Sequence, residues 1–372
     1  MLSSAIESTA APASKSSFYP LTVREAKPET AEAMVVTFTV PPQWKSLFRF
    51  IQGQHLTLRA NIEGEEVRRS YSICSAVQDP ALRVAIKLVP GGVFSHWAAE
   101  NLKTGATVEV MPPVGHFYVP LSADNRKHYV AFAAGSGITP VLSIAKTTLI
   151  AEPHSRFTLF YGNRSSETIM FGEELADLKD AFLGRFNLAH ILTREHQECE
   201  LFNGRITAEK CGELLKQLGR IEDIDEVFIC GPQEMSEALA EKLKAIGVPE
   251  TRVKVELFSA APSTRKRVVV AAATAAVEDC EVAITADGRQ RTFMMMRGDQ
   301  SILDAALKRG IPLRYSCKSG VCATCRAKLT EGKVDMDVNY ALEPEEVRRG
   351  FILTCQSYPV TDHVKVDFDQ DN

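Results

Sequence analysis

About the first hundred residues contain short runs in which hydrophobic and polar positions alternate, with turn-forming residues between the runs. Alternation with a period of two is typical of strands that bury one face, and no long helical period occurs until late in this part. The pattern therefore predicts a small antiparallel β-barrel. Its clearest strand is EVRRSYSICSA, which begins at Glu66.

The middle of the chain has a different pattern. The apolar run HYVAFAA leads into the glycine-rich turn AFAAGSGITP (131–140) and then into VLSIAKTTLI, whose pattern is helical. Two further apolar runs follow, RFTLFYG and DEVFICGPQEM. Strand, glycine turn and helix in this order predict an α/β, Rossmann-like domain with a pyrophosphate site at a helix N-terminus, although Gly135 to Gly137 taken alone would also fit a tight turn.

Composition narrows the class of protein. The 372 residues are 45% hydrophobic and carry a net charge of −4, so the chain can bury two or three cores. No run of about 18 apolar residues occurs and the N-terminus lacks a signal-peptide pattern, so we expect a soluble, cytoplasmic protein without membrane contact. No long basic block is present, and we expect no nucleic-acid partner.

Four of the nine cysteines form a metal-binding pattern. Three lie in RYSCKSGVCATC and the fourth in FILTCQSYP, which gives the spacing C-x4-C-x2-C-x29-C. A loop with three thiolates and a distant fourth favours a 2Fe-2S cluster over zinc, whose ribbons favour two matched C-x2-C pairs. The predicted ligands are Cys317, Cys322, Cys325 and Cys355.

The strand EVRRSYSICSA carries a candidate flavin site. Arg69 and Tyr71 share one face of the strand, and a cation beside an aromatic ring suits a phosphate attached to a flat ring. About twenty residues later, KLVPGGVFSHW supplies a glycine turn before a helix, whose N–H groups suit a second phosphate of FAD. FMN stays open, because Arg69 alone can hold one phosphate. The candidate flavin-binding residues are Arg69, Ser70, Tyr71, Ser72, Lys87, Gly91, Gly92, Val93 and Ser95.

The α/β part carries a candidate site for a pyridine nucleotide. An NAD-selective site commonly places an acid after the second strand, whereas this chain has Arg164 and Ser165 there, which suit a 2′-phosphate. We therefore expect NADPH as the better donor, with NADH possible. The lone Cys230 is expected to be a packed neighbour of the nicotinamide rather than a nucleophile. The candidate nucleotide-binding residues are Gly135, Gly137, Thr139, Arg164, Ser165, Gly231 and Pro232.

With these motifs in hand, residues 18–258 resemble the ferredoxin–NADP reductase family and residues 278–368 resemble plant-type ferredoxin. The flavin motif Arg-x-Tyr-Ser stands here at Arg69 to Ser72, and the Cys-Gly-x motif begins at Cys230. The terminal acid-x-aromatic element resembles Glu256-Leu257-Phe258, with Phe in place of the C-terminal Tyr of plastid members. The resemblance implies catalytic roles for Ser72, Cys230 and Glu256, and a flavin contact for Phe258.

The resemblance also implies the organisation of the chain: an antiparallel β-barrel that binds FAD (18–120), a nucleotide domain (125–258), a linker (259–277) and an α+β, β-grasp ferredoxin domain (278–368). The order resembles the electron-transfer components of multicomponent oxygenases, in which electrons pass from NADPH through FAD and the cluster to an oxygenase, here expected to contain a di-iron centre.

Within that group, YGNRSSETIMF and CGPQEM are most similar to reductase subunits of phenylacetyl-CoA epoxidases, which act in aerobic phenylacetate degradation. Reductases of steroid or aromatic hydroxylases, or of hybrid-cluster proteins, share the same motifs and stay open as alternatives. A non-catalytic flavin and iron–sulfur redox sensor is the remaining alternative.

Overall fold

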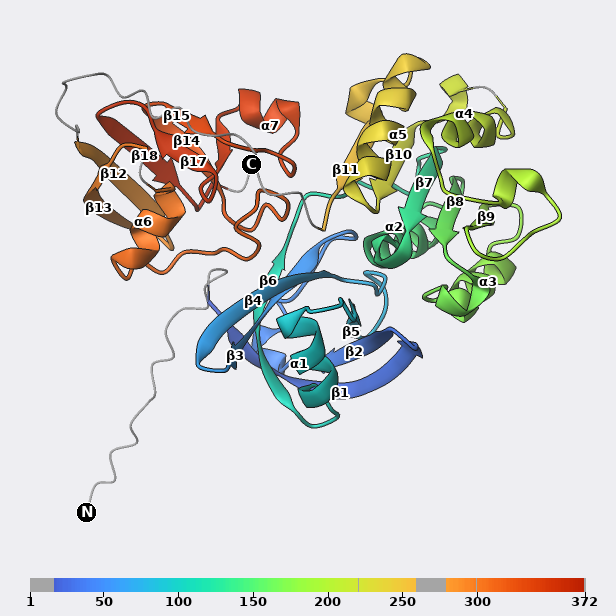
Figure 1. Ribbon diagram of the computed structural model, residues 1–372, viewed down its shortest axis with the longest axis horizontal. Coiled ribbons are helices and arrows are strands. Elements are labelled where there is room, and N and C mark those ends of the chain that lie inside the picture. Colours follow the sequence, from blue (N-terminus) through green and yellow to red (C-terminus); the bar gives the residue numbers. More distant parts are fainter. Residues whose placement is uncertain (1–16, 220, 259–278, 299, 371–372) are drawn as a thin grey trace.

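Three bodies follow one another along the chain, each built on its own sheet (Figure 1). The structure is a computed structural model that describes residues 17–219, 221–258, 279–298 and 300–370. The expected linker at 259–277 lies outside the described residues. Across the described residues, no helix is both long and apolar enough to pass through a membrane.

The first body is a six-stranded antiparallel sheet with the order β4-β3-β6-β1-β2-β5. A bridge between Ile73 and Val84 joins the end of the first strand in that order to the last, which curls the sheet toward a closed barrel. The short helix α1 packs at one end, where Phe94 and Ala98 enter the barrel core. The elements are β1 (Tyr19–Thr30), β2 (Ala33–Thr39), η1 (Pro42–Trp44), β3 (His55–Ile62), β4 (Glu65–Ser72), β5 (Leu82–Lys87), α1 (Val93–Asn101) and β6 (Thr107–Val114).

The second body is a parallel five-stranded sheet, order β11-β10-β7-β8-β9, with helices on both faces. Consecutive residues of the central strand β7 point to opposite faces of the sheet and enter two separate cores. Tyr129 packs with α2 and α3, and Val130 packs with α4 and α5. The elements are β7 (His128–Ala134), η2 (Gly135–Gly137), α2 (Ile138–Ala151), β8 (Arg156–Asn163), η3 (Ser166–Thr168), α3 (Gly172–Ala181), β9 (Phe186–Leu192), η4 (Glu200–Phe202), α4 (Ala208–Lys216), η5 (Ile221–Asp223), β10 (Glu226–Cys230), α5 (Gln233–Ala245), η6 (Glu250–Arg252) and β11 (Val253–Glu256).

The third body is a mixed five-stranded sheet, order β13-β12-β18-β14-β16, with a small two-stranded sheet beside it. Ile302 and Leu303 of α6 pack into its core, so the amphipathic stretch SILDAALKRG is a helix as its pattern indicates. The elements are β12 (Asp279–Ala286), β13 (Arg289–Met296), α6 (Ile302–Lys308), β14 (Arg326–Glu331), β15 (Val334–Met336), α7 (Pro344–Arg348), β16 (Phe351–Leu353), β17 (Ser357–Pro359) and β18 (His363–Asp367). The predicted antiparallel, α/β and α+β fold classes are therefore confirmed.

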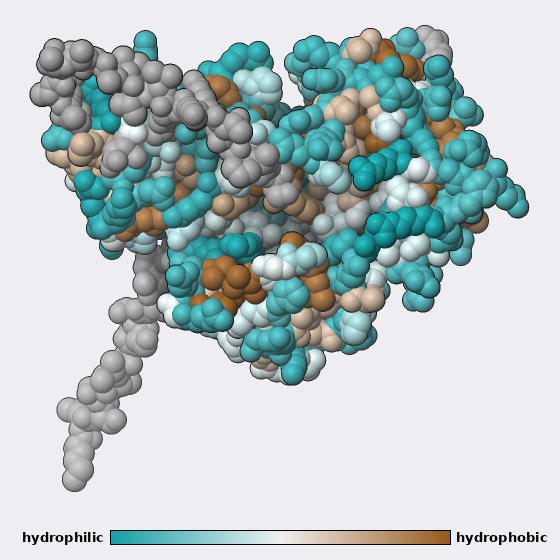
Figure 2. All heavy atoms as spheres, viewed as in Figure 1, coloured by the Kyte–Doolittle hydropathy of each residue, from teal (hydrophilic) through white to brown (hydrophobic). Residues whose placement is uncertain are grey.

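The three bodies meet around the first one. In the space-filling view the second and third bodies stand apart at their far ends, with a notch between them, and both rest on the first (Figure 2). Most of the surface in this view is hydrophilic. The residues of interest for function lie where the bodies touch.

Candidate functional site

The four predicted cluster cysteines gather at one end of the third body. The loop before β14 is tightly wound: Lys318 and Ala323 have positive φ angles of 55° and 50°, and Gly320 has one of 79°. A Cβ on Gly320 would lie 3.0 Å from the Val338 side chain. A larger residue at this position would therefore crowd Val338 and would also have to adopt a strained positive φ angle. Such a fold brings successive backbone N–H groups toward one side of the loop.

Within this loop the sulfurs lie as two pairs. The Cys322 thiol donates toward Cys317, which lowers the pKa of Cys317 to about 5, and Cys325 pairs in the same way with Cys355, whose pKa is lowered. The N–H of Ser319 also donates to Sγ of Cys317, at 3.4 Å. A backbone donor therefore points at sulfur within this loop.

This donor set fits a binuclear cluster. Two pairs of thiolates suit two irons, whereas a structural zinc takes four ligands around one centre. The residues present thus match a 2Fe-2S cluster better than the zinc alternative.

The cluster loop is bound directly to the strand pair β3–β4 of the first body. The Ser70 hydroxyl donates to Oγ of Ser316 at 2.9 Å, and Nε2 of His55 shares a hydrogen bond of 3.2 Å with Oγ1 of Thr324. The guanidinium of Arg68 lies 3.9 Å from the ring centroid of Tyr315. One face of the strand pair therefore carries the ferredoxin loop.

The opposite face of β4 carries two of the residues predicted to hold the flavin, Arg69 and Tyr71. The other two, Ser70 and Ser72, lie on the face that contacts the ferredoxin loop and Glu256. Tyr71 packs against the ring of Phe94, with 5.8 Å between centroids, and burial raises its phenol pKa well above the usual range. Arg69 is exposed, and its Nη1 donates to the backbone carbonyl of Arg68 at 2.7 Å. The two side chains share a face, as predicted, and the guanidinium is accessible to a phosphate.

The glycine turn predicted to bind a second phosphate precedes α1, which begins at Val93 with Gly92 as its N-cap. Ser95 is buried, accepts from the N–H of Val89 at 3.2 Å and donates to the carbonyl of Gly92 at 3.1 Å. Its hydroxyl therefore closes the turn, and the N–H of Gly92 closes it further by donating to the carbonyl of Val89 at 2.8 Å. Gly91 has a φ of 70° within the same turn.

The pyrophosphate turn lies between β7 and α2, as the pattern predicts. A Cβ on Gly137 would lie 2.1 Å from the carbonyl oxygen of Cys230, so only glycine lets the ends of β7 and β10 approach this closely. Thr139 donates to the carbonyl of Ser136 at 3.0 Å and thereby stabilises the turn. Tyr161 donates to the carbonyl of Gly135 at 2.9 Å.

A cavity of about 990 Å³ opens beside this turn at the carboxyl ends of the parallel strands. This is where an open α/β sheet binds its ligands. Its lining holds four cationic side chains: Lys87, Arg164, Arg194 and Arg205. Lys87 and Arg164 are among the site residues predicted from the sequence, and the other two are not. Lys87, expected at the flavin, thus lies on the nucleotide side of the first body. Pro232 also lines the cavity, and Gly231 precedes it.

Arg194 and Arg205 are not predicted from the sequence. The position of Arg194 after a strand is one pattern that could have identified it. Arg194 follows the end of β9, just as Arg164 follows the end of β8, and its N–H donates to the carbonyl of Arg164 at 2.7 Å. Residues after neighbouring parallel strands meet at one edge of a sheet. Ser165, the predicted partner of Arg164, caps η3 through a capping box with Thr168.

The predicted catalytic residues meet at the end of β11. Cys230 lies beside Glu256 in the parallel register, and Ser72 of the first body donates to Oε2 of Glu256 at 3.2 Å. Burial raises the pKa of Glu256 to about 8, while the bond from Ser72 lowers it in part. Burial likewise keeps the Cys230 thiol protonated, because its pKa lies well above the usual range. Phe258 is 43% exposed.

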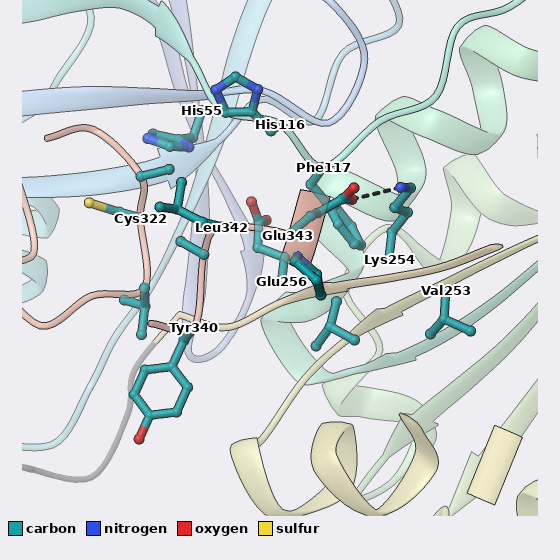
Figure 3. Close-up of a pocket in the computed structure, with 16 residues that line it drawn as sticks. His55, His116, Phe117, Val253, Lys254, Glu256, Cys322, Tyr340, Leu342 and Glu343 are labelled. Carbon is teal, nitrogen blue, oxygen red and sulfur yellow. Dashed lines mark hydrogen bonds and ion pairs between the residues drawn. The ribbon is translucent and has the colours of Figure 1, made fainter. Parts of the chain in front are cut away.

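A cavity of about 190 Å³ lies at the junction of the three bodies and is lined by Glu256, Cys322 and His55 among others (Figure 3). His55 is 4% exposed, and burial, assisted by the nearby His116, lowers its pKa to about 4. Lys254 and Glu343 form an ion pair of 2.6 Å across this junction. One hydride-transfer candidate, Glu256, and one cluster ligand, Cys322, therefore border the same space.

This architecture and these sites define a flavin-dependent pyridine-nucleotide reductase with its own ferredoxin. Three domain families match the chain: an oxidoreductase FAD-binding domain (20–118), an oxidoreductase NAD-binding domain (132–241) and a 2Fe-2S iron-sulfur cluster binding domain (284–360). The chain belongs to the family of ferredoxin–NADP-reductase-like enzymes that carry a C-terminal 2Fe-2S domain. It is an NAD(P)H-dependent oxidoreductase.

Relatives of similar length share this arrangement. A subunit of the 1,2-phenylacetyl-CoA epoxidase of Escherichia coli (strain K12) is 45% identical, across 95% of this chain and 98% of the relative. The ferredoxin reductase component of the 3-ketosteroid-9-alpha-monooxygenase of Rhodococcus rhodochrous is 35% identical, across 94% and 96%. The crystal structure of phthalate dioxygenase reductase shares the fold with a TM-score of 0.57 at 22% identity, across 94% of this chain and 98% of that one.

Proposed function

We propose that this chain is the reductase component of a phenylacetyl-CoA epoxidase and passes electrons from NADPH through FAD and a 2Fe-2S cluster to a di-iron oxygenase in the cytoplasm. The observation that carries the electron path is the junction cavity, because Glu256 and Cys322 line the same space. The particular oxygenase is supported by the 45% identity to the epoxidase subunit of Escherichia coli along nearly the whole of both chains.

Each residue in the path has a distinct proposed role. Arg69 binds a flavin phosphate, together with backbone N–H groups at the start of α1, and Tyr71 packs on the flavin ring. Ser72 and Glu256 hold a proton beside the nicotinamide. Bound flavin takes two electrons as a hydride, whereas a 2Fe-2S cluster takes them singly, so the chain needs both groups.

On the nucleotide side, the proposed donor is NADPH. Four cationic side chains surround the cavity beside the pyrophosphate turn, and such charge suits a 2′-phosphate in addition to the pyrophosphate. Gly135 and Gly137 let the backbone approach the pyrophosphate, while Thr139 stabilises the turn that does so.

A steroid hydroxylase is the second candidate acceptor, because the relative from Rhodococcus rhodochrous is 35% identical over a comparable span.

The first test is the visible spectrum of the purified protein before and after anaerobic NADPH, which reports flavin, cluster and electron flow together. A redox sensor without turnover would not sustain NADPH oxidation with ferricyanide.

The second test compares acceptors. Purified epoxidase and steroid-hydroxylase oxygenase components are each supplied with this reductase and NADPH, and coupled product formation is measured. We expect turnover with the epoxidase. Turnover with the hydroxylase alone would overturn the proposed acceptor while leaving the electron path intact.

A further inference from the structure

Arg164, which lines the nucleotide cavity, takes part in an ion pair that no motif in the sequence predicts. Glu32 lies in the turn between β1 and β2 of the flavin-binding domain, and its Oε2 is 2.5 Å from Nη2 of Arg164. The same oxygen is 3.8 Å from Nζ of Lys87. A carboxylate from one domain therefore engages two of the four cations that surround the nucleotide cavity of another.

Hydrogen bonds from both the flavin-binding domain and the nucleotide domain fix the turn that carries Glu32. The N–H of Leu88 donates to the carbonyl of Glu32 at 2.7 Å, which fixes the turn to its own domain. Glu29, three residues earlier, accepts from the N–H of Phe171 at 2.5 Å, in front of α3 of the nucleotide domain. The position of the carboxylate is thus set by the packing of the two domains.

The charged groups with the largest effects on Glu32 are all cationic. Arg164, Lys87 and Arg194 each lower the pKa of the Glu32 carboxyl, with the hydrogen bond from Arg164 as the largest cause. The carboxylate is therefore ionised at neutral pH. Nearly half of each side chain of the pair is accessible to water, so the ion pair can open without unfolding anything, and such pairs cost little to break.

A nucleotide 2′-phosphate is the ligand whose chemistry this pair resembles, because it too presents anionic oxygens to a guanidinium. NADPH must displace the carboxylate from Arg164 and then bind beside it, whereas the uncharged 2′-hydroxyl of NADH does not compete for the guanidinium. The presence of Glu32 therefore lowers affinity for one donor and leaves the other unaffected.

We propose that Glu32 is a specificity-determining residue of the nucleotide site: it occupies Arg164 in the free enzyme and weakens the binding of nucleotides that carry a 2′-phosphate. This inference rests on the proposed role of the cavity as the NADPH site. It adds a determinant that lies outside the nucleotide-binding domain, on the neighbouring flavin-binding domain.

The test measures dissociation constants of the flavin- and cluster-loaded protein by calorimetry, with 2′,5′-ADP and 5′-AMP as probes that differ only in the 2′-phosphate. We expect Glu32→Gln to tighten 2′,5′-ADP about three- to fivefold and to leave 5′-AMP within about twofold. Glu32→Ala should give the same selective gain. The matched control is Glu25→Gln, which removes a charge from β1 of the same domain but pairs with Lys27, so that its carboxylate does not engage Arg164.

A double-mutant cycle separates this inference from the function on which it rests. If Arg164→Gln weakens 2′,5′-ADP and also abolishes the gain from Glu32→Gln, the competition at Arg164 is supported. Unchanged or weaker 2′,5′-ADP binding in Glu32→Gln, or an equal gain for both probes, would overturn it. If neither Arg164→Gln nor Arg194→Gln affects 2′,5′-ADP, the proposed NADPH site itself fails, and the role of Glu32 fails with it.

Discussion

The Ser72 hydroxyl donates a hydrogen bond of 3.2 Å to Oε2 of Glu256, and the two residues are 184 positions apart in the chain. One belongs to the flavin-binding sheet and the other to the last strand of the nucleotide domain. The bond therefore exists only when the two domains are packed together, and it connects the two residues proposed to hold a proton beside the nicotinamide.

This pair predicts a pH dependence of stability. The folded-state pKa of Glu256 is about 8, raised by burial from an ordinary value of 4.5. The neutral carboxyl contributes its full stability below pH 4.5, and that contribution is lost as the pH rises to about 8. We expect the melting temperature of the wild type, relative to Glu256→Gln, to fall across this window.

Ser72→Ala provides the second arm of that experiment. Because the bond from Ser72 lowers the pKa of Glu256, its removal should raise the pKa and extend the loss of stability to higher pH. The melting temperatures of the wild type and Glu256→Gln are plotted against pH from 5 to 9. If the difference between them does not change with pH, the carboxyl is already ionised in the folded protein.

The contact between cluster loop and flavin-binding strand predicts a defect in electron transfer between the domains. Thr324→Val removes the hydrogen bond to His55, and we expect arrival of electrons at the cluster to slow about three- to tenfold, the scale of one hydrogen bond. Stopped-flow absorbance after NADPH addition measures it. Reduction of the flavin should keep its rate, and Thr330→Val, on an exposed part of β14, is the matched control. If flavin reduction and cluster reduction slowed equally, Thr324 would support the folded structure in general rather than electron transfer between the domains.

Gly137→Ala should disrupt the nucleotide site through the backbone. The added methyl group would overlap the Cys230 carbonyl, and relief of that overlap must move β10 or the pyrophosphate turn. We expect a loss of about 2 kcal/mol in the free energy of unfolding, together with loss of NADP⁺ binding. Gly172→Ala is the control, since its new Cβ would lie 3.5 Å from the nearest atom. Normal NADP⁺ affinity in Gly137→Ala would contradict the proposed close approach.

The flavin site can be tested without disturbing the cluster. Tyr71→Ala removes the ring that packs beside Phe94, Arg69→Ala removes the phosphate anchor, and both proteins should purify with little flavin. Iron content should stay normal, because the ferredoxin domain has a separate core. Tyr71→Phe keeps the ring and should keep the flavin. Parallel loss of iron would argue against independent domains.

Cys322→Ser should separate the two halves of the reaction. It removes one of four thiolates, so the cluster should be lost or altered while every residue proposed for hydride transfer stays in place. NADPH oxidation with ferricyanide should persist, and electron delivery to the oxygenase should fall to background. Cys199→Ser, at an exposed cysteine outside the cluster loop, should leave both activities unchanged. Normal delivery by Cys322→Ser would mean that electrons leave directly from the flavin.

Much of this molecule is predictable because its signals are local. The spacing of Cys317 to Cys355, the turn around Gly135 and the alternation around Tyr71 each depend on a few neighbouring residues and on strand or helix geometry. From these patterns follow the order of the three folds and the chemistry that each carries. The roles of individual side chains are less accessible: Ser95 is a candidate flavin-binding residue in the sequence, and the structure shows its hydroxyl closing the turn before α1.

What the tertiary structure alone decided are the contacts between the domains. The sequence places Arg164 after β8, where an acid would favour NADH, and Glu32 reaches this arginine from a turn 132 positions earlier. His55 meets Thr324 across 269 positions. No period or motif encodes such pairs, because their distance depends on how three separately folded cores pack against one another. The sequence by itself thus determined which groups each domain carries, and the packing decided which of those groups face each other.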